Sequence, residues 1–274
     1  MITPDDKKKL NRERRGQILP EELDAYVKFQ TEHLIEMLST DNPQKRTIAA
    51  TILGNRGDEN AILPLCTSLK KEKALYSRIA MSETLSKIGE PAVPYLINLL
   101  GEIGNNQEKE LPKKYFNKKS FPLARDMAAR TLVNIGNPAT PYLIKTLEIE
   151  NNFKVQQAID ALGGIAAKTG DQRALIPLIK FIEKMNGQDH HNQITYWKIV
   201  RALSGFNNCK CASETLVKVL MDDQTPPIIW EAIRSLGQIG IVSSKINELL
   251  SNFKNSSHPE IKKSCENALI NLSV

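Results

Sequence analysis

The chain has 274 residues, of which 41% are hydrophobic and only 5% aromatic, and it carries a formal net charge of +6. Its polar start and the absence of any run of about 18 apolar residues predict no secretory signal, no transmembrane span and a cytoplasmic location. Residues 1–20 and 102–121 hold five of the six excess positive charges, so the rest of the chain lacks the continuous basic stripe that nucleic-acid binding requires.

The first 20 residues predict a separate basic helix. Pro4 suits the first helical position, Asp5 and Asp6 suit the first turn, and Gly16 is expected to end the helix. We expect its basic residues to form a solvated face, and the alternative is contact with an acidic partner or a membrane surface. These residues are Lys7, Lys8, Lys9, Arg12, Arg14 and Arg15. Pro20 should open a second helix that runs to Met37 and Leu38.

From residue 21 to residue 274 the chain repeats one pattern. Its clearest copy is Arg46-x-x-Ala49-Ala50-x-x-Leu53-Gly54, and a second copy begins at Arg125. Seven copies align on Leu53, Leu85, Leu132, Leu162, Leu203, Leu236 and Leu269. The spacings of 32, 47, 30, 41, 33 and 33 residues give a period near 33 with two insertions. Such a period predicts a stacked array in which each unit contacts its neighbours.

Each unit is predicted to hold two helices. One helix follows a turn that contains proline, and the other carries the aligned Leu behind a face of small residues that permits close packing. Glycines that should adopt the left-handed conformation follow the Leu-bearing helices at Gly57, Gly89, Gly136, Gly170 and Gly240. No strand-like alternation competes with this pattern, so we expect an all-α solenoid of about seven helix pairs.

The pattern from Arg46 to Leu65 resembles HEAT repeats of the type found in phycobilin lyases. The resemblance implies a right-handed superhelix that serves as a protein-binding scaffold, with the Leu-bearing helices on its concave side. It also implies that the Arg46, Arg78 and Arg125 ladder is structural, with Asp41 as the acid that pairs with Arg46; the alternative is a contact in a binding groove.

The candidate binding site rests on the two tryptophans, which are one repeat apart. Trp197 and Trp230 each precede an arginine by four residues, Arg201 and Arg234, so each pair shares a helix face. Trp and Arg are enriched at binding hot spots and can stack on each other. Two further residues complete the candidate site, Lys198 and Arg130. The alternative is that each Trp fills a gap between repeats.

Two stretches interrupt the period. Residues 102–121 form a polar insertion, for which we expect a solvated or partly disordered loop; the alternative is a nucleic-acid strand held by its basic and aromatic side chains. Those side chains are Lys113, Lys114, Tyr115, Phe116, Lys118, Lys119 and Phe121. Residues 184–194 contain His190 and His191, which cannot readily share one metal ion in a flexible loop.

The cysteines predict no disulfide framework and no metal site. Cys66 and Cys265 fall on apolar helix faces, where a free Cys behaves as a small hydrophobe. Cys209 and Cys211 lie in a turn and lack the two-residue gap that is usual in zinc sites.

The sequence favours a non-enzymatic scaffold that binds a partner protein or peptide on its concave surface, without cofactor, metal or membrane, as a monomer or weak oligomer. The first alternative is a bilin lyase or isomerase subunit, which only the repeat type suggests. The second is a HEAT-like DNA-binding protein or alkylpurine DNA glycosylase with Asp160 as its catalytic acid. The near-neutral repeats count against this second alternative.

Overall fold

The computed structural model describes residues 4–104, 107–115, 118, 120–185, 193–223 and 225–273, and every regular element in these ranges is a helix. The α-helices are α1 (Pro4–Arg14), α2 (Thr31–Met37), α3 (Pro43–Arg56), α4 (Ile62–Lys71), α5 (Leu75–Ile88), α6 (Val93–Leu99), α7 (Met127–Ile135), α8 (Thr140–Thr146), α9 (Asn152–Thr169), α10 (Leu175–Lys184), α11 (Gln193–Leu203), α12 (Lys210–Asp222), α13 (Pro226–Ile239), α14 (Ser244–Phe253) and α15 (Pro259–Leu272). Short 3₁₀ turns lie at Pro20–Leu23, Glu59–Ala61, Glu90–Ala92 and Asn137–Ala139.

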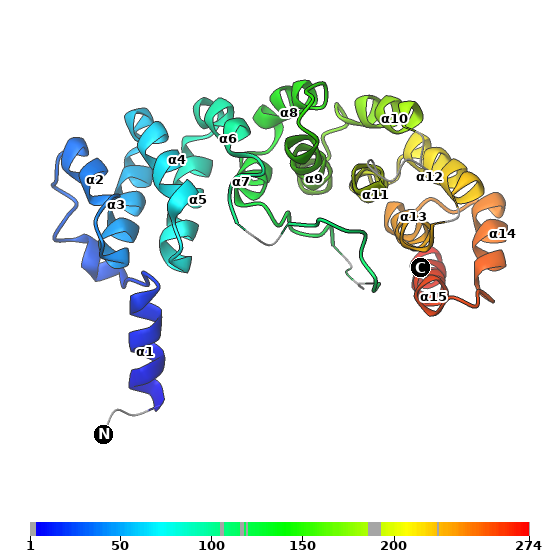
Figure 1. The fold of residues 1–274 in the computed structure, drawn as a ribbon, viewed down its shortest axis with the longest axis horizontal. Helices are drawn as coiled ribbons and strands as arrows, with labels where there is room; N and C mark the ends of the chain where they lie inside the picture. The colour runs from blue at the N-terminus through cyan, green and yellow to red at the C-terminus, as the bar shows by residue number, and fades with distance from the viewer. Residues whose placement is uncertain are drawn as a thin grey trace. The chain divides into compact units, whose positions relative to one another are not determined.

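The helices form two compact units, and in each of them helix pairs are stacked side by side. Unit 1 comprises residues 1–105 and 126–139, and it holds the pairs α2/α3, α4/α5 and α6/α7. Unit 2 comprises residues 106–125 and 140–274, and it holds α8/α9, α10/α11, α12/α13 and α14/α15. In each unit the even-numbered helices form one layer and the Leu-bearing helices form the other (Figure 1). The all-α solenoid of seven helix pairs is therefore confirmed.

The aligned leucines form the core of each stack. Six of them are at most 1% exposed, and Leu269 on α15 is half-buried. Glycine follows the Leu where neighbouring backbones approach most closely. A Cβ on Gly163 would lie 2.7 Å from Ala202 Cα, and a Cβ on Gly237 would lie 2.7 Å from Ala268 Cα. The expected close approach through small residues is thus confirmed, since any larger side chain would push the helices apart.

The predicted helix boundaries are mostly confirmed. The prolines lie in the first turns of α4, α6, α8 and α10, and a glycine with positive φ directly follows each of α3, α5, α7, α9 and α13. Gly57, Gly170 and Gly240 adopt the left-handed conformation. For Gly89 and Gly136 this prediction was wrong, because their ψ angles of −133° and −138° lead directly into a 3₁₀ turn.

The continuous helix expected from Pro20 to Met37 and Leu38 is also wrong. A 3₁₀ turn at Pro20–Leu23 is followed by irregular turns, and α2 begins only at Thr31. The guanidinium of Arg56 donates hydrogen bonds to the carbonyls of Val27 and Phe29, both at 2.7 Å. These carbonyls are therefore directed toward α3 rather than along a helix axis, which breaks the segment before α2.

The basic helix α1 ends before Gly16, as expected, and it buries none of its residues. Its lysines and arginines are exposed, and their role as a solvated face stays a prediction. The division into a helix over 1–20 and a solenoid over 21–274 stays a prediction. Across the described residues, no helix combines the length and the apolar character that crossing a membrane requires.

The first two arginines of the ladder both bind Glu72, which follows α4, so Arg46 joins adjacent pairs and Arg78 acts within its own pair. Arg46 Nε lies 2.7 Å from Glu72 Oε2, and Arg46 Nη2 lies 2.9 Å from Glu72 Oε1. Arg78 Nη2 donates to the backbone carbonyl of Glu72 at 2.6 Å. The structural role is confirmed for these two arginines, but Asp41 was the wrong acid. Asp41 offers Arg46 its backbone carbonyl, at 3.1 Å, while the carboxylate of Glu72 completes the bidentate pair.

Candidate interaction site

The tryptophan and arginine pairs lie on the adjacent helices α11 and α13 of unit 2, and they are buried. Trp197 and Trp230 are each 1% exposed, and Arg201 and Arg234 are each 5% exposed. Lys198 on α11 is completely buried. The structure therefore brings these five residues together, but not as an exposed patch. Arg130 lies half-buried on α7 in unit 1. The binding role of all six residues stays a prediction.

A buried ion cluster links α9 to α11. Lys198 Nζ donates to Asp160 Oδ2 at 2.6 Å, and Arg201 Nη2 donates to Asp160 Oδ1. The guanidinium of Arg201 also stacks over the Trp197 ring, with its Cζ 4.3 Å from the ring centroid. The four-residue spacing on one helix produces this stack, as the sequence allowed.

A second buried pair lies on α13. Arg234 Nε donates to Glu231 Oε1 at 2.7 Å, and its other nitrogens donate to Gln238 Oε1 at 2.9 Å and to Ser204 Oγ at 3.2 Å. The helices thus supply three buried cations (Lys198, Arg201 and Arg234) and two buried carboxylates (Asp160 and Glu231) to this face. Three positive and two negative charges leave a net charge of +1.

The charge that balances this surplus comes from the insertion. Glu108 Oε2 lies 3.1 Å from Lys198 Nζ, and Glu108 Oε1 lies 3.2 Å from Arg201 Nη1. Arg125, at the other end of the insertion, also reaches Glu108, with 3.1 Å between Arg125 Nε and Glu108 Oε1. Burial by itself raises the pKa of Glu108, but the charges of Lys198 and Arg201 outweigh burial and lower it. The pKa of Asp160 is lowered for the same reason.

The insertion then continues across α13 to α15. The Tyr115 ring meets the Trp230 ring edge to face, with centroids 5.5 Å apart and an interplanar angle of 87°. Lys263 Nζ lies 5.8 Å from the centroid of the same tyrosine ring, and the Tyr115 backbone N–H donates to the Glu260 carboxylate. Tyr115 is therefore only 9% exposed. Phe121 returns to α9, where its ring leaves no room for a side chain at Gly163.

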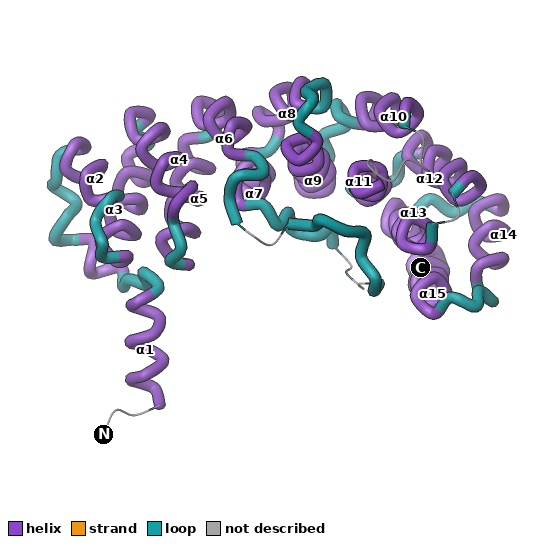
Figure 2. The backbone as a smooth tube through the Cα atoms, viewed as in Figure 1, coloured by secondary structure: helices purple, strands orange, loops and turns teal. Residues whose placement is uncertain are grey.

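We call residues 107–115 the occupying segment. It has no helix or strand and runs alongside the Leu-bearing layer of unit 2 (Figure 2). The solvated loop expected for 102–121 is therefore wrong for this segment, because Glu108 and Tyr115 have partners on the helices. Lys113, Lys114 and Lys118 are exposed, and Phe116 and Lys119 lie outside the described residues.

The other candidate residues from the sequence lie in the following places. Asp160, proposed for a glycosylase, does lie beside Trp197 and Arg201, but it is 2% exposed and paired with two cations, so its carboxylate is not available as an acid or base. Cys66 and Cys265 are buried, as predicted, and Cys211 is exposed. His190 and His191 lie outside the described residues. Among the residues described, no group of three or more His, Cys, Asp or Glu side chains could hold a metal ion.

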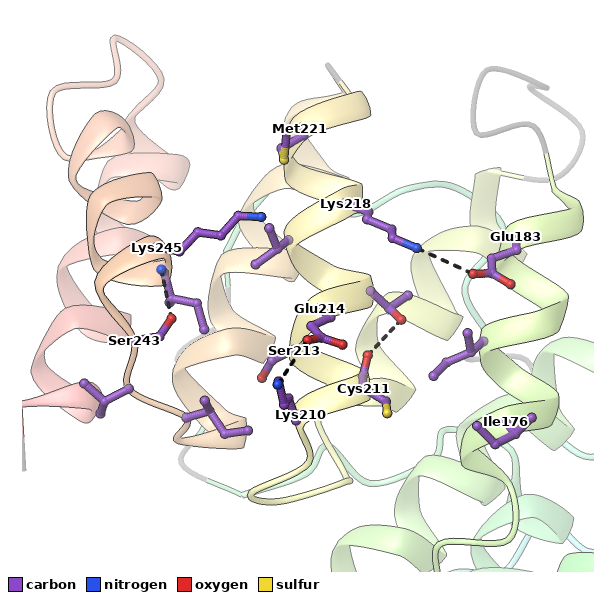
Figure 3. A pocket seen from close by; sticks show the side chains of 16 residues that line it. Ile176, Glu183, Lys210, Cys211, Ser213, Glu214, Lys218, Met221, Ser243 and Lys245 are labelled. Carbon is purple, nitrogen blue, oxygen red and sulfur yellow. Dashed lines mark hydrogen bonds and ion pairs between the residues drawn. The ribbon is translucent and has the colours of Figure 1, made fainter.

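The outer layer of unit 2 carries an open groove of about 780 Å³ between α10, α12 and α14 (Figure 3). Ile176, Met221 and Val242 expose 51%, 61% and 59% of their surfaces along it. Its rim carries the exposed ion pairs Lys218–Glu183 and Lys210–Glu214, each at 3.8 Å. No segment of the described chain occupies this groove, so it differs from the face that holds the occupying segment.

A family model described as HEAT repeats matches residues 31–105. Residues 31–105 therefore carry HEAT repeats. The match spans α2 to α6, and the later helix pairs continue the same leucine register.

Among solved structures, a computationally designed armadillo repeat protein for modular peptide recognition is similar, with 17% identity, 88% of this chain and 99% of that chain covered, and a TM-score of 0.42. Human deoxyhypusine hydroxylase in complex with glycerol has 16% identity, 98% and 96% coverage, and a TM-score of 0.38. The complex of CpcE and CpcF of phycocyanin lyase from a Nostoc species has 22% identity, 89% and 95% coverage, and a TM-score of 0.35. The comparison with curated proteins found no match.

Proposed function

We propose that this HEAT-repeat protein is a non-enzymatic scaffold that binds an extended stretch of a partner protein on the Leu-bearing helices α9, α11, α13 and α15. The observation that carries this proposal is the occupying segment itself, an extended stretch of polypeptide held on this layer by Glu108 and Tyr115. A surface that engages one extended chain through buried charges and an aromatic ring has the chemistry to engage another.

The contacts also favour recognition over catalysis. Asp160 is engaged by Lys198 and Arg201, and Glu231 is engaged by Arg234, so the buried carboxylates of this face stabilise cations. A catalytic acid or base must come within reach of a substrate, and Asp160 and Glu231 are at most 2% exposed. The cytoplasmic location expected from the sequence is part of this proposal.

Site-directed photo-crosslinking in cells tests the proposal. A photoreactive amino acid at Lys263, which is exposed beside Tyr115 on α15, should join the protein to a partner. The matched control places the same amino acid at Met221, which is 61% exposed on the outer groove. Mass spectrometry then locates the joined residues in the partner.

We expect the photoreactive residue at position 263, and not the one at position 221, to crosslink to one stretch of the partner. The crosslinked residues should lie in an extended segment of that partner. Equal joining from both positions, or joining only from the outer groove, would contradict a binding surface on the Leu-bearing layer. Fractionation of the same cells reports whether the protein lies in the cytoplasm.

A further inference from the structure

We infer that the occupying segment is a built-in competitor for this surface, and that the partner stretch carries an acidic residue followed seven positions later by an aromatic residue. This inference rests on the proposed function. The spacing is that of Glu108 and Tyr115, which contact α11 and α13.

The acidic position follows from the charges of the helices. On the helices, the three cations Lys198, Arg201 and Arg234 are salt-bridged to two carboxylates, Asp160 and Glu231. A chain that covered these cations without adding a carboxylate would desolvate one positive charge more than it pairs, which is costly. Any chain that replaces the segment must therefore supply a carboxylate where Glu108 lies, between Lys198 Nζ and Arg201 Nη1.

The aromatic position follows from the groups around Tyr115. The Tyr115 ring packs edge to face with the Trp230 ring, and Lys263 approaches the tyrosine ring from α15. The Glu260 carboxylate accepts a hydrogen bond from the backbone N–H of the tyrosine, so it fixes the main chain at this position whatever the side chain. These contacts select a flat ring on an extended backbone.

Most of the residues between these two positions point to solvent. Lys109, Glu110, Lys113 and Lys114 are exposed, and Leu111 and Pro112 are half-buried. The recognised feature is thus mainly the spacing of the acidic and aromatic residues. Because the segment is tethered to the same chain, its effective concentration is of millimolar order, which is enough to compete with a free peptide.

The test uses the full-length protein and a fluorescent peptide with the sequence of residues 104–118. Binding is measured by fluorescence anisotropy to the wild type and to an E108Q/Y115A variant, in which the segment has lost both anchors. The matched control variant is E110Q/Y95A, which makes the same chemical changes at an exposed glutamate and at a tyrosine of α6 that is 41% exposed. The single variant E108Q provides a second measurement if the double variant is unstable.

We expect the peptide to bind E108Q/Y115A at least roughly tenfold more tightly than it binds the wild type or the control, because release of the segment raises the fraction of open surface. A peptide with Gln and Ala in place of its own Glu and Tyr should lose this binding. Faster tryptic cleavage at the exposed Lys113 and Lys114 reports release of the segment independently.

The other outcomes separate the two ideas. Equal, residue-dependent binding to the wild type and to E108Q/Y115A would overturn competition by the segment and leave the proposed function standing. Tighter binding that ignores the Glu and Tyr of the peptide would overturn the inferred specificity alone. No binding to a variant whose segment is demonstrably released by proteolysis would overturn the peptide-binding surface and thus the proposed function as well.

Discussion

Replacement of Asp160 with alanine tests whether the ion cluster holds α9 and α11 together. Asp160 accepts from Lys198 Nζ at 2.6 Å and from Arg201, and all three side chains are at most 7% exposed. Without Asp160, these two cations share only Glu108. Breaking a buried ion pair from one side costs about 3–5 kcal/mol, because it leaves a buried charge unpaired. A domain has about 5–15 kcal/mol of stability in total, so unit 2 should lose a large fraction of its own.

Urea unfolding followed by tryptophan fluorescence measures this loss selectively, because both tryptophans of the chain lie in unit 2. The matched control is Glu214→Ala, which removes the acid of the exposed Lys210–Glu214 pair, at 3.8 Å. An exposed pair of this kind is worth about 0–1 kcal/mol. The two variants delete one carboxylate each, and they should differ by several-fold in their effect on the free energy of unfolding.

The double variant Asp160→Ala/Lys198→Met then separates the lost attraction from the unpaired charge. It should recover part of the stability that Asp160→Ala loses, since Arg201 alone can pair with Glu108. If Asp160→Ala lowers the free energy of unfolding no more than Glu214→Ala does, the ion cluster does not stabilise the stack, and its charges do not require a carboxylate from the bound segment.

Three further predictions address packing, pH and thiol chemistry. Gly163→Ala gains about 1 kcal/mol of helix propensity, but its Cβ would lie 2.7 Å from Ala202 Cα, and such overpacking costs about 1–3 kcal/mol. Urea unfolding should therefore show a net loss of up to about 2 kcal/mol, and a net gain would contradict the close approach. The pKa of Asp160 is lower in the folded protein than its value of about 3.9 in the unfolded chain, so the ionised carboxylate stabilises the fold above that pH. This stabilisation is lost as the pH falls through the folded pKa. The urea midpoint should therefore decrease at pH values below about 4, and it should decrease less in Asp160→Ala. Burial raises the pKa of Cys66 to about 12, so a thiol reagent at pH 8 should modify the exposed Cys211 quickly and Cys66 only after urea unfolding; rapid modification of Cys66 in the folded protein would contradict its burial.

The repeat register could be predicted because its causes are local. Leu53 and Leu132 each lie one helix turn after an Ala-Ala pair, and the glycine after Leu162 or Leu236 lies where the next helix must approach. The turns between Pro20 and Thr31 could not be predicted in the same way. Their conformation depends on Arg56, which lies almost one repeat further along the chain and binds two of their carbonyls.

The candidate site could be predicted only in part, because some of its contacts join residues that are far apart in the sequence. The stacking of Arg201 on Trp197 follows from their four-residue spacing. Their burial does not, because it depends on a segment that precedes Arg201 by about 90 residues. The local composition around Glu108 and Tyr115 is that of a polar loop, and nothing near them in the sequence indicates partners on α11, α13 and α15.

The contact between Tyr115 and Glu260 joins residues 145 positions apart, and this separation sets an order of events during synthesis. At about 5–20 residues per second, roughly 7–30 s pass between the addition of the tyrosine and that of its acceptor. Throughout this interval the growing polypeptide already contains the ring but not the helix on which it comes to rest. A newly made molecule therefore passes through a period in which the occupying segment cannot yet bind α15.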